Sequence, residues 1–498
     1  MRKVKYLLSG LLVLGFSLQA VSAERIDPVK ATASGVRDFG FELFLSLYSK
    51  NPEDPVAISP MSIAEALTLA TYGSEKQTKT ELEKLFISEA LHKEGGDVKM
   101  LSYGLGSIRK SLKQYAAESK GIFEYQSANS LWANNNPDVD FKFRASFVKV
   151  AEKEFAAESF ARDFAATEEV EGEKVQTTVR EANQWVSTQT KEKIKELLSK
   201  LSDDDVAIIL NAVYAKGKFK AHFNQLKEGE YTRDGADKPE TVTYMTKTED
   251  MGYFEDKSVK AFSFNVGASN EEEQGPADQI AVDILVPKSG KLSDLAGVLS
   301  GSYYDKVVSG LKSENVELTL PAGKVEQQEA AKLKDSLKAE PFKLSRAFDE
   351  KNAQFKPLGS VAGDLNLYIN DILTKTFYEV TPFGFEAAAA TAVVFSRESA
   401  VIPRQPLQAK VNSASLHVVR HIPSGLPLFV VEYDSPKRYT EEELIDLVEL
   451  GAKNRRSLSA QVKDGTLRVG YDDKTNTDVL GVYDEDYKLV RKIKTIER

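Results

Sequence analysis

The first 200 residues carry apolar side chains that recur at the spacing of one helical face. The pattern is clear in residues 34–50, in residues 62–70 after Ser59 and Pro60, and in residues 180–198. A period close to 3.6 residues gathers such side chains into one stripe, which a helix buries against the rest of the fold. We therefore predict a mainly helical N-terminal part with one helix in each segment.

From residue 206 onward the pattern changes to short, nearly continuous apolar runs that are rich in β-branched residues. The runs are 206–214, 242–245, 281–286, 316–320 and 377–380. Their length and composition are typical of buried strands. Together with the helical part they predict an α+β fold in which helices pack on a large sheet. The polar segments 227–239 and 270–279 predict solvated loops between the runs.

The composition changes again after residue 436. Thr440 and Glu443 have the spacing of a capping box at the start of a short helix. Alternating segments at 467–471 and 479–483 then predict a small hairpin. Residues 437–498 are therefore a candidate C-terminal extension, to which the sequence assigns no function.

The N-terminus has the order of features found in a secretory signal. Residues 1–5 are cationic, residues 6–18 are apolar, and residues 21–23 (VSA) place small side chains where signal peptidase cuts. A membrane anchor is the alternative, but the apolar run is short for a span and contains Gly10 and Gly15. We predict cleavage after residue 23 and a secreted or periplasmic protein.

Net charge and cysteine content exclude several classes of partner and site. The formal charge is -9 at pH 7 with both signs mixed along the chain, so no basic field favours nucleic acid. No later segment is long and apolar enough for stable membrane insertion. The chain has no cysteine, which excludes disulfides, thiolate metal sites and a cysteine nucleophile.

The signatures of common enzymes are missing from the sequence. The four histidines, His92, His222, His417 and His421, form no HExxH pattern or other metal-like cluster, and no GxSxG, GxxxxGK or strand-flanked GxGxxG is present. We expect neither a metal nor a cofactor, and no catalytic activity. Scattered carboxylates that assemble into a glycosidase-like pair remain a weaker alternative, because sequence separation does not test it.

The most unusual local sequence is residues 375–395. A strand at 377–380 runs into a turn around Pro382 and Gly384, and a stretch with very small side chains follows. By intrinsic propensity alone the run from Ala387 to Ala390 favours a helix.

Taken with its flanks, this segment resembles the hinge of the serpin family, where a Glu-Val strand precedes Gly, a small residue, Glu, four small residues and Thr. The matching positions are Glu379, Val380, Gly384, Glu386, Ala387, Ala388, Ala389, Ala390 and Thr391. Other segments resemble serpin signatures in the same order, among them 58–63 (ISPMSI), 183–186 (NQWV), 211–217 (NAVYAKG), 370–372 (NDI) and 420–425 (RHIPSG). The chain thus resembles a bacterial-type exported serpin with a C-terminal extension.

The resemblance implies a serpin fold for residues 24–436. Such a fold has a helical N-terminal part on a large, mostly antiparallel central sheet, further smaller sheets, and an exposed reactive-centre loop at about residues 384–405. It also implies a monomeric inhibitor whose partner is a serine protease. In serpins the protease serine forms an acyl-enzyme with the loop, the freed loop enters the central sheet as a strand, and the displaced protease is trapped. The uncut fold is accordingly metastable.

Alternation along the inserting strand places Phe385, Ala387, Ala389 and Thr391 on the inward face. Small side chains enter a packed core easily, but Phe385 stands where the family has Thr or Ser. A ring at this position is expected to slow insertion. It favours the alternative function, a non-inhibitory serpin-like binding or structural protein, whereas the alanines favour inhibition.

Family positions near the centre of the sheet are only partly retained. Ser59, Ser62 and Asn211 are present and predict a polar cluster beneath the sheet. Thr374 replaces an expected histidine, and Phe219 replaces an expected tryptophan.

Counting from Gly384 with the spacing usual in serpins puts the cleaved bond between Glu398 and Ser399, which implies a protease that accepts an acidic side chain. Cleavage between Arg397 and Glu398 by a trypsin-like protease is the first alternative, and cleavage after Arg404 is the second.

Arg109, Lys110 and Lys113 lie on a predicted helix at 107–120 that resembles the polyanion-binding helix of some serpins. A solvated helix face is the preferred interpretation of these three cations.

Overall fold

The computed structural model describes residues 26–50, 55–202, 205–268, 276–327, 329–361, 366–385, 405–454, 456–472 and 475–496. The predicted signal segment lies outside these ranges, and so do residues 386–404 of the predicted reactive-centre loop.

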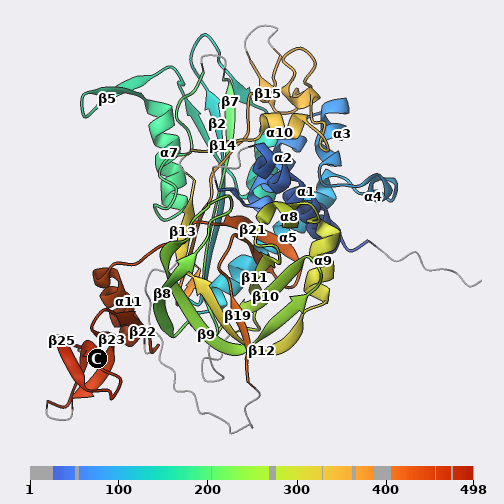
Figure 1. The fold of residues 1–498 in the computed structure, drawn as a ribbon. Helices are drawn as coiled ribbons and strands as arrows, with labels where there is room; N and C mark the ends of the chain where they lie inside the picture. The colour runs from blue at the N-terminus through green and yellow to red at the C-terminus, as the bar shows by residue number, and fades with distance from the viewer. Residues whose placement is uncertain are drawn as a thin grey trace, which may run out of the picture.

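Helices make up most of the N-terminal part, as predicted (Figure 1). They are α1 (Pro28–Lys50), α2 (Pro60–Tyr72), α3 (Lys76–Lys84), α4 (Glu89–Lys93), α5 (Val98–Glu118), α6 (Ala145–Phe155) and α7 (Thr177–Gln189), followed later by α8 (Leu292–Ala296), α9 (Gly301–Ser309), α10 (Lys334–Lys338) and α11 (Glu441–Lys453). The start of α2 has a local cause. Ser59 caps it by accepting the Ser62 N–H, and Pro60 occupies the first turn.

The helix predicted for residues 180–198 is wrong in its second half. Helix α7 ends at Gln189, and Lys191 and Glu192 follow with positive φ angles of 49° and 63°. The chain then folds back, so that Asn183 Oδ1 accepts the Leu197 and Leu198 N–H groups, each at 2.9 Å. The apolar residues of this segment are buried as expected, but they lie in the chain that folds back after α7 and not on a helix.

One sheet has six strands in the order β13-β17-β18-β7-β2-β4. Their bounds are β13 (Gly323–Glu326), β17 (Phe377–Thr381), β18 (Gly384–Phe385), β7 (Ala207–Lys218), β2 (Phe123–Asn134) and β4 (Glu158–Arg162). All neighbours are antiparallel except β2 and β4. The runs 206–214 and 377–380 thus form strands, as predicted.

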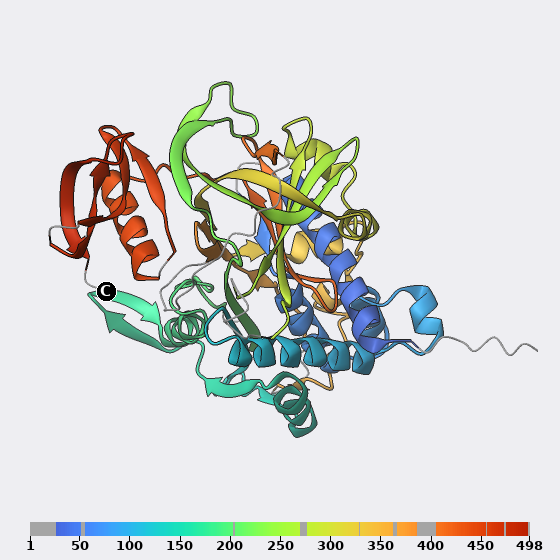
Figure 2. The ribbon, with the colours of Figure 1, turned by 90° about the horizontal axis from the view of Figure 1, so that it is seen from below.

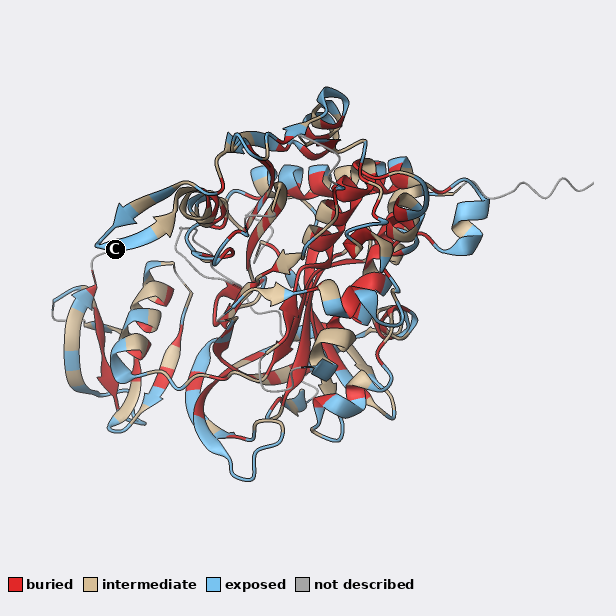
Figure 3. Cartoon of the chain, turned by 90° about the horizontal axis from the view of Figure 1, so that it is seen from above, coloured by how far each residue is buried: buried red, intermediate tan, exposed pale blue. Residues whose placement is uncertain are grey.

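Helices cover both faces of this sheet. Leu210 and Ala212 of β7 pack with Val186 of α7, whereas Ile209 packs with Leu69 of α2. Successive side chains of a strand point to opposite faces, so β7 is buried between the two helices. Figure 3 shows buried residues concentrated along strands near the centre of the molecule.

The second sheet has thirteen strands. The main path is β1-β21-β20-β11-β10-β9-β8-β22-β23-β24-β25, and β12 pairs with β9 and β19. The bounds are β1 (Ala57–Ile58), β8 (Gln225–Tyr231), β9 (Glu240–Glu255), β10 (Val259–Val266), β11 (Ile280–Pro287), β12 (Lys312–Pro321), β19 (Leu407–Lys410), β20 (Ser415–His421) and β21 (Leu426–Tyr433), with β22 (Ser459–Val462), β23 (Gly465–Asp472), β24 (Thr477–Tyr483) and β25 (Leu489–Ile496) in the extension.

Three two-stranded sheets complete the strands. They pair β3 (Lys142–Phe143) with β15 (Gly359–Ser360), β5 (Thr167–Val170) with β6 (Glu173–Gln176), and β14 (Ala331–Lys332) with β16 (Leu373–Thr374). The α+β prediction, with a large sheet and smaller ones, is confirmed.

The loop predicted for residues 227–239 is wrong at its beginning. Residues 227–231 belong to β8, which pairs antiparallel with β9 from Gln225 to Tyr231. Leu226 and Tyr231 are buried, while the residues between them are polar and mostly exposed. Because only Leu226 and Tyr231 are buried, the strand lacks the continuous apolar run that predicts a buried strand from the sequence.

The extension folds as a helix packed on a four-stranded antiparallel ribbon. The capping box at Thr440 and Glu443 is confirmed, and β23 and β24 form the predicted hairpin. Figure 2 shows this unit at one side of the molecule. It is joined to the larger sheet through β22, which pairs in parallel with β8.

Among the described helices, none is both long enough and apolar enough to cross a membrane.

Glu432 is a buried carboxylate in the core of the larger sheet. Its Oε2 accepts the Val56 N–H at 3.0 Å, and the residue is 7% exposed. Burial, with a smaller contribution from the charges of Asp434 and Asp234, raises the pKa of Glu432 from 4.5 to about 7. Because the folded chain favours the protonated acid, this group removes stability as the pH rises from about 4.5 through 7.

We expect Glu432→Gln to raise the melting temperature above that of the wild type at pH 8.5, and to bring no gain at pH 5. The neutral amide removes the penalty of burying a charge, which exists only at the higher pH. Thermal unfolding followed by circular dichroism at both pH values tests this. Glu314→Gln, at an exposed position of β12, is the control and should shift the melting temperature equally at both. A pH-independent effect of Glu432→Gln would contradict the assignment.

Candidate functional site

The site begins where β17 turns back into the six-stranded sheet. Pro382 and Phe383 form a two-residue turn, after which Gly384 pairs with Thr381 and Phe385 pairs with Val380. On its other edge β18 pairs with Lys218 and Gly217 of β7. Two hinge residues therefore already lie between β17 and β7.

Phe385 is buried in this position and is 2% exposed. A Cβ atom on Gly217 would lie 2.6 Å from Phe385 Cε1, so the glycine leaves the space that the ring fills. A Cβ atom on Gly384 would lie 2.1 Å from the Gly217 carbonyl oxygen, which explains a glycine there as well. The ring that was expected to obstruct insertion is thus accommodated before any cleavage.

The rest of the predicted hinge and both predicted bonds lie outside the described residues. These are Glu386, Ala387, Ala388, Ala389, Ala390 and Thr391, with Arg397, Glu398 and Ser399.

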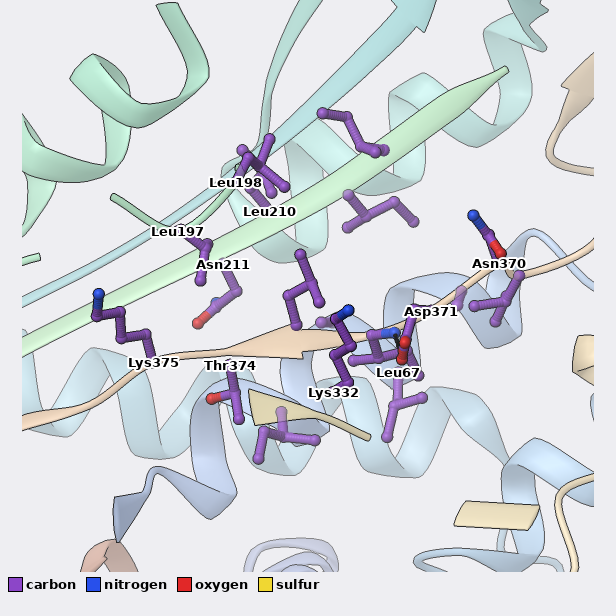
Figure 4. A pocket seen from close by; sticks show the side chains of 18 of the residues that line it. Leu67, Leu197, Leu198, Leu210, Asn211, Lys332, Asn370, Asp371, Thr374 and Lys375 are labelled. Atoms are coloured by element: carbon purple, nitrogen blue, oxygen red, sulfur yellow. Dashed lines mark hydrogen bonds between the residues drawn. The ribbon is translucent and has the colours of Figure 1, made fainter. Parts of the chain in front are cut away.

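Beyond β18 a cavity of about 470 Å³ lies between β7 and residues 366–377. We call it the sheet opening. Figure 4 shows Leu210 and Asn211 on the β7 side, with Thr374 of β16 and the following Lys375 opposite. Leu67 of α2 belongs to its lining. One wall is β7, and the other is the chain that leads through β16 to β17, so the cavity lies in line with β18 and its shape suits an additional strand.

The predicted polar cluster lies beside the sheet opening, and the structure brings its three residues together. Ser62 Oγ donates to Asn211 Oδ1, and Ser59 Oγ accepts the Ser62 N–H at 3.3 Å. Asn211 Nδ2 in turn donates to Asn129 Oδ1 at 2.8 Å. The hydrogen bonds tie the start of α2 to the middle of β7 and β2.

Sequence reasoning missed the charge at the centre of this cluster. Glu65 of α2 is 0% exposed, and its carboxylate accepts from Asn211 Nδ2 at 3.0 Å and from Ser127 Oγ at 3.0 Å. Its Oε1 pairs with Arg109 Nη1 of α5 at 2.5 Å. The available signal was a single acidic residue inside the apolar run of α2.

The interpretation of Arg109 as part of a solvated or polyanion-binding face is wrong. Arg109 is buried, pairs with Glu65, and donates through Nη2 to the Glu154 carbonyl at 2.5 Å. Lys110 and Lys113 are exposed on the same helix. Helical spacing turns Arg109 toward the core, on the face of the buried Leu105 and Leu112.

The two positions that differ from the serpin pattern also border the site. Thr374 is buried and lines the sheet opening. Phe219 is fully buried, and its N–H donates to the Phe383 carbonyl at 3.0 Å. Its ring belongs to an aromatic group that encloses the ammonium of Lys247, which lies 3.8 Å from the centroid of Phe264. Burial lowers the pKa of Lys247, with Glu249 opposing the shift.

Across the part of the chain that the structure describes, no three His, Asp or Glu side chains form a group suited to a metal ion.

Comparison with known proteins places this geometry in a family. The family model described as Serpin (serine protease inhibitor) matches residues 34–436. An uncharacterized serpin-like protein of Thermococcus kodakarensis is 26% identical over 409 residues, covering 82% of this chain and 86% of its own. The human plasma serine protease inhibitor is 26% identical over 378 residues, covering 75% and 84%. The crystal structure of the thermophilic serpin Tengpin in the native state superposes with a TM-score of 0.67 at 25% identity, covering 83% and 96%.

We expect Arg109→Ala to destabilise the fold by about 3–5 kcal/mol, because it leaves the Glu65 carboxylate buried without its ion-pair partner. Lys110→Ala, one residue away and exposed, should change stability by about 0.5 kcal/mol or less. Urea unfolding measured by fluorescence compares the two variants with the wild type. Equal, small effects would contradict a buried ion pair.

Proposed function

The chain belongs to the serpin family, and from that membership we propose that it inhibits a serine protease as a suicide substrate. In this proposal the protease cleaves the reactive-centre loop, the loop segment that follows Phe385 enters the sheet opening, and the acyl-enzyme is trapped. The human relative named as a plasma serine protease inhibitor supports protease inhibition in general.

The observation that carries the proposal is the two-residue strand β18. It lies between β17 and β7, antiparallel to both, and the sheet opening continues the space that it occupies. Insertion would lengthen this strand from its free end.

The observed register predicts where each inserting residue would lie. If the pairing of β18 is continued in steps of two residues, Ala387 would lie opposite Tyr378 and Ala215. Ala389 would lie opposite Thr376 and Val213. Opposed residues of antiparallel strands share a face, so these alanines would point to the side on which Phe385 is buried. Their small side chains suit a packed interior.

The same register brings Thr391 opposite Asn211 and Thr374. Its hydroxyl would then lie beside the polar cluster of Ser59, Ser62 and Glu65 and meet groups that hydrogen-bond. The polar residue that ends the alanine run thus falls where the core beneath the sheet is polar.

Insertion in this register would supply both a displacement of the protease and a driving force. Residues 386–398 in extended conformation span on the order of 43 Å, which carries a tethered protease far along the sheet. A strand that pairs along both edges adds on the order of a dozen hydrogen bonds, each worth about 1 kcal/mol net. Such a displacement would distort the triad and the oxyanion hole of the protease.

Phe385 no longer favours a non-inhibitory protein. Its ring is buried against Gly217 in the uncleaved chain, so burying it is not a step that follows cleavage. The first residues that must enter after cleavage are Glu386 and Ala387. The bulk of Phe385 therefore adds no barrier between acylation and trapping.

We propose the same cellular location and the same reactive bond that the sequence predicts. Residues 1–23 would direct export to the periplasm or the exterior, where the protein acts as a monomer on an acidic-specific or trypsin-like protease. Glu398–Ser399 is the proposed bond, with Arg397–Glu398 as the alternative.

We expect a matching serine protease to form a covalent complex that survives boiling in detergent. Incubation with trypsin and with a glutamate-specific serine protease, followed by denaturing electrophoresis at short times, detects it. Sequencing the released C-terminal fragment identifies the bond: Ser399 as first residue supports cleavage after Glu398, and Glu398 supports cleavage after Arg397. Complete loop cleavage without a covalent band, by either protease, would contradict the suicide mechanism.

We expect Ala387→Arg to turn the inhibitor into a substrate that is cleaved without trapping. The register puts this side chain against buried Tyr378 and Ala215, where a charge has no partner and costs several kcal/mol at the first step of insertion. Ala388→Arg is the matched control, because alternation turns it to the opposite face. The fraction of protease trapped per loop cleaved is the measurement. Equal trapping by both variants would show that the register is wrong.

A further inference from the structure

The C-terminal extension meets the body of the protein at the turn from which the loop would insert. Strand β22 pairs with β8 through Ser459 opposite Gln225 and Ala460 opposite Leu226, and the Ser459 N–H donates to the Asn224 carbonyl at 3.0 Å. Residues 456–460 therefore run beside residues 219–226, which connect β7 to β8. Figure 1 shows β22 and α11 on this side of the molecule, next to β8.

Residues 219–226 hold the turn between β17 and β18. The Phe219 N–H donates to the Phe383 carbonyl at 3.0 Å, and the Phe223 N–H donates to the Pro382 carbonyl at 2.8 Å. Both carbonyls of the two-residue turn are thus fixed by this connection. Any element that fixes residues 219–226 also fixes the turn.

Arg456 of the extension binds both sides of this junction. Its Nη1 donates to the Phe219 carbonyl at 3.2 Å and to the Phe383 carbonyl at 3.4 Å. One guanidinium therefore joins the end of β7 to the turn that follows β17. A charged donor makes stronger hydrogen bonds to carbonyls than a neutral one does.

The ring of Phe383 is held by the extension as well. A Cβ atom on Gly451 would lie 3.2 Å from Phe383 Cζ, so α11 packs directly against the ring. On another side the ring stacks on His222, with centroids 6.1 Å apart, and His222 Nε2 lies 2.9 Å from the Ser457 carbonyl. Burial lowers the pKa of His222 to about 4, so the imidazole is neutral at physiological pH and its Nε2–H donates to this carbonyl.

We propose that the C-terminal extension is a positioning element for loop insertion and that Arg456 is its principal positioning residue. The inference rests on the proposed inhibitory function. Insertion lengthens the β17–β18 hairpin at its open end, so the turn itself stays in place while new pairs form beyond Phe385. A turn that is fixed in advance keeps Gly384 and Phe385 in register. The conformational entropy of closing the hairpin is then lost before cleavage and does not slow insertion. Insertion then competes better with hydrolysis of the acyl-enzyme.

The test compares three single variants of the full chain. Arg456→Ala removes the hydrogen bonds to the Phe219 and Phe383 carbonyls. Arg456→Lys keeps a cationic donor. Arg438→Ala is the matched control, because Arg438 also connects the extension to the body of the protein, through an exposed ion pair with Glu228 of β8 at 2.6 Å rather than through the turn.

The first measurement is the number of inhibitor molecules consumed per protease molecule trapped, with the protease that gives a complex with the wild type. We expect this ratio to rise severalfold in Arg456→Ala, with the initial rate of loop cleavage unchanged, and to recover in part in Arg456→Lys. Arg438→Ala should match the wild type. A ratio unchanged in Arg456→Ala, or raised equally in Arg438→Ala, would overturn the proposal, since a merely structural contact would not act selectively on partition.

The second measurement needs no protease. Hydrogen exchange of the Phe219 and Phe223 amides should be about fivefold faster in Arg456→Ala than in the wild type, the change expected when the turn loses its one hydrogen bond from Arg456. If the wild type forms no covalent complex, the inhibitory function fails, and exchange alone then decides whether Arg456 holds the turn. Unchanged exchange at both amides would show that Arg456 does not fix the turn.

Discussion

The architecture depends on a sheet in which one inner strand has two described residues. Gly384 and Phe385 separate β17 from β7 at one end, and the sheet opening takes up the space beyond them. A β-sheet is stabilised by hydrogen bonds along both edges of each inner strand, so a short inner strand leaves favourable pairing to be formed. The proposed inhibition, the small side chains after Phe385 and the glycines at 217 and 384 all relate to this one constraint.

Polar and charged side chains beneath the six-stranded sheet, as well as apolar packing, hold its strands and helices together. Glu65 connects α2, α5, β2 and β7 through Arg109, Ser127 and Asn211. A buried network of this kind has defined geometry, so it favours discrete arrangements of the strands above it over gradual deformation. In the proposed insertion, Thr391 would lie opposite Asn211 and could offer it a further hydrogen-bond partner.

The sequence predicts those parts of the fold that depend on local pattern. Helix α2 follows from the cap at Ser59 and the apolar spacing after it, and β7, β11 and β12 follow from runs of β-branched residues. The errors concern tertiary contacts. Strand β8 buries only its two ends, Arg109 finds a partner 44 positions away, and the tolerance for Phe385 comes from Gly217, which is distant in sequence. Neither the hydrophobic period nor the intrinsic propensity of a segment indicates contacts between residues that are distant in sequence. The contact between Arg456 and Phe383 is another of this kind.

The parallel pairing of β22 with β8 has a further consequence for association between molecules. Without the extension, β8 would present an open edge of the larger sheet, and exposed edges template pairing with other chains. The extension covers the beginning of that edge, at Gln225 and Leu226, and makes β25 the last described strand of the main path. This new edge carries Arg491, Lys492 and Lys494, and charged side chains on an edge strand oppose the approach of a second strand. The extension thereby moves the end of the main path to a strand whose charged side chains disfavour pairing with a second chain.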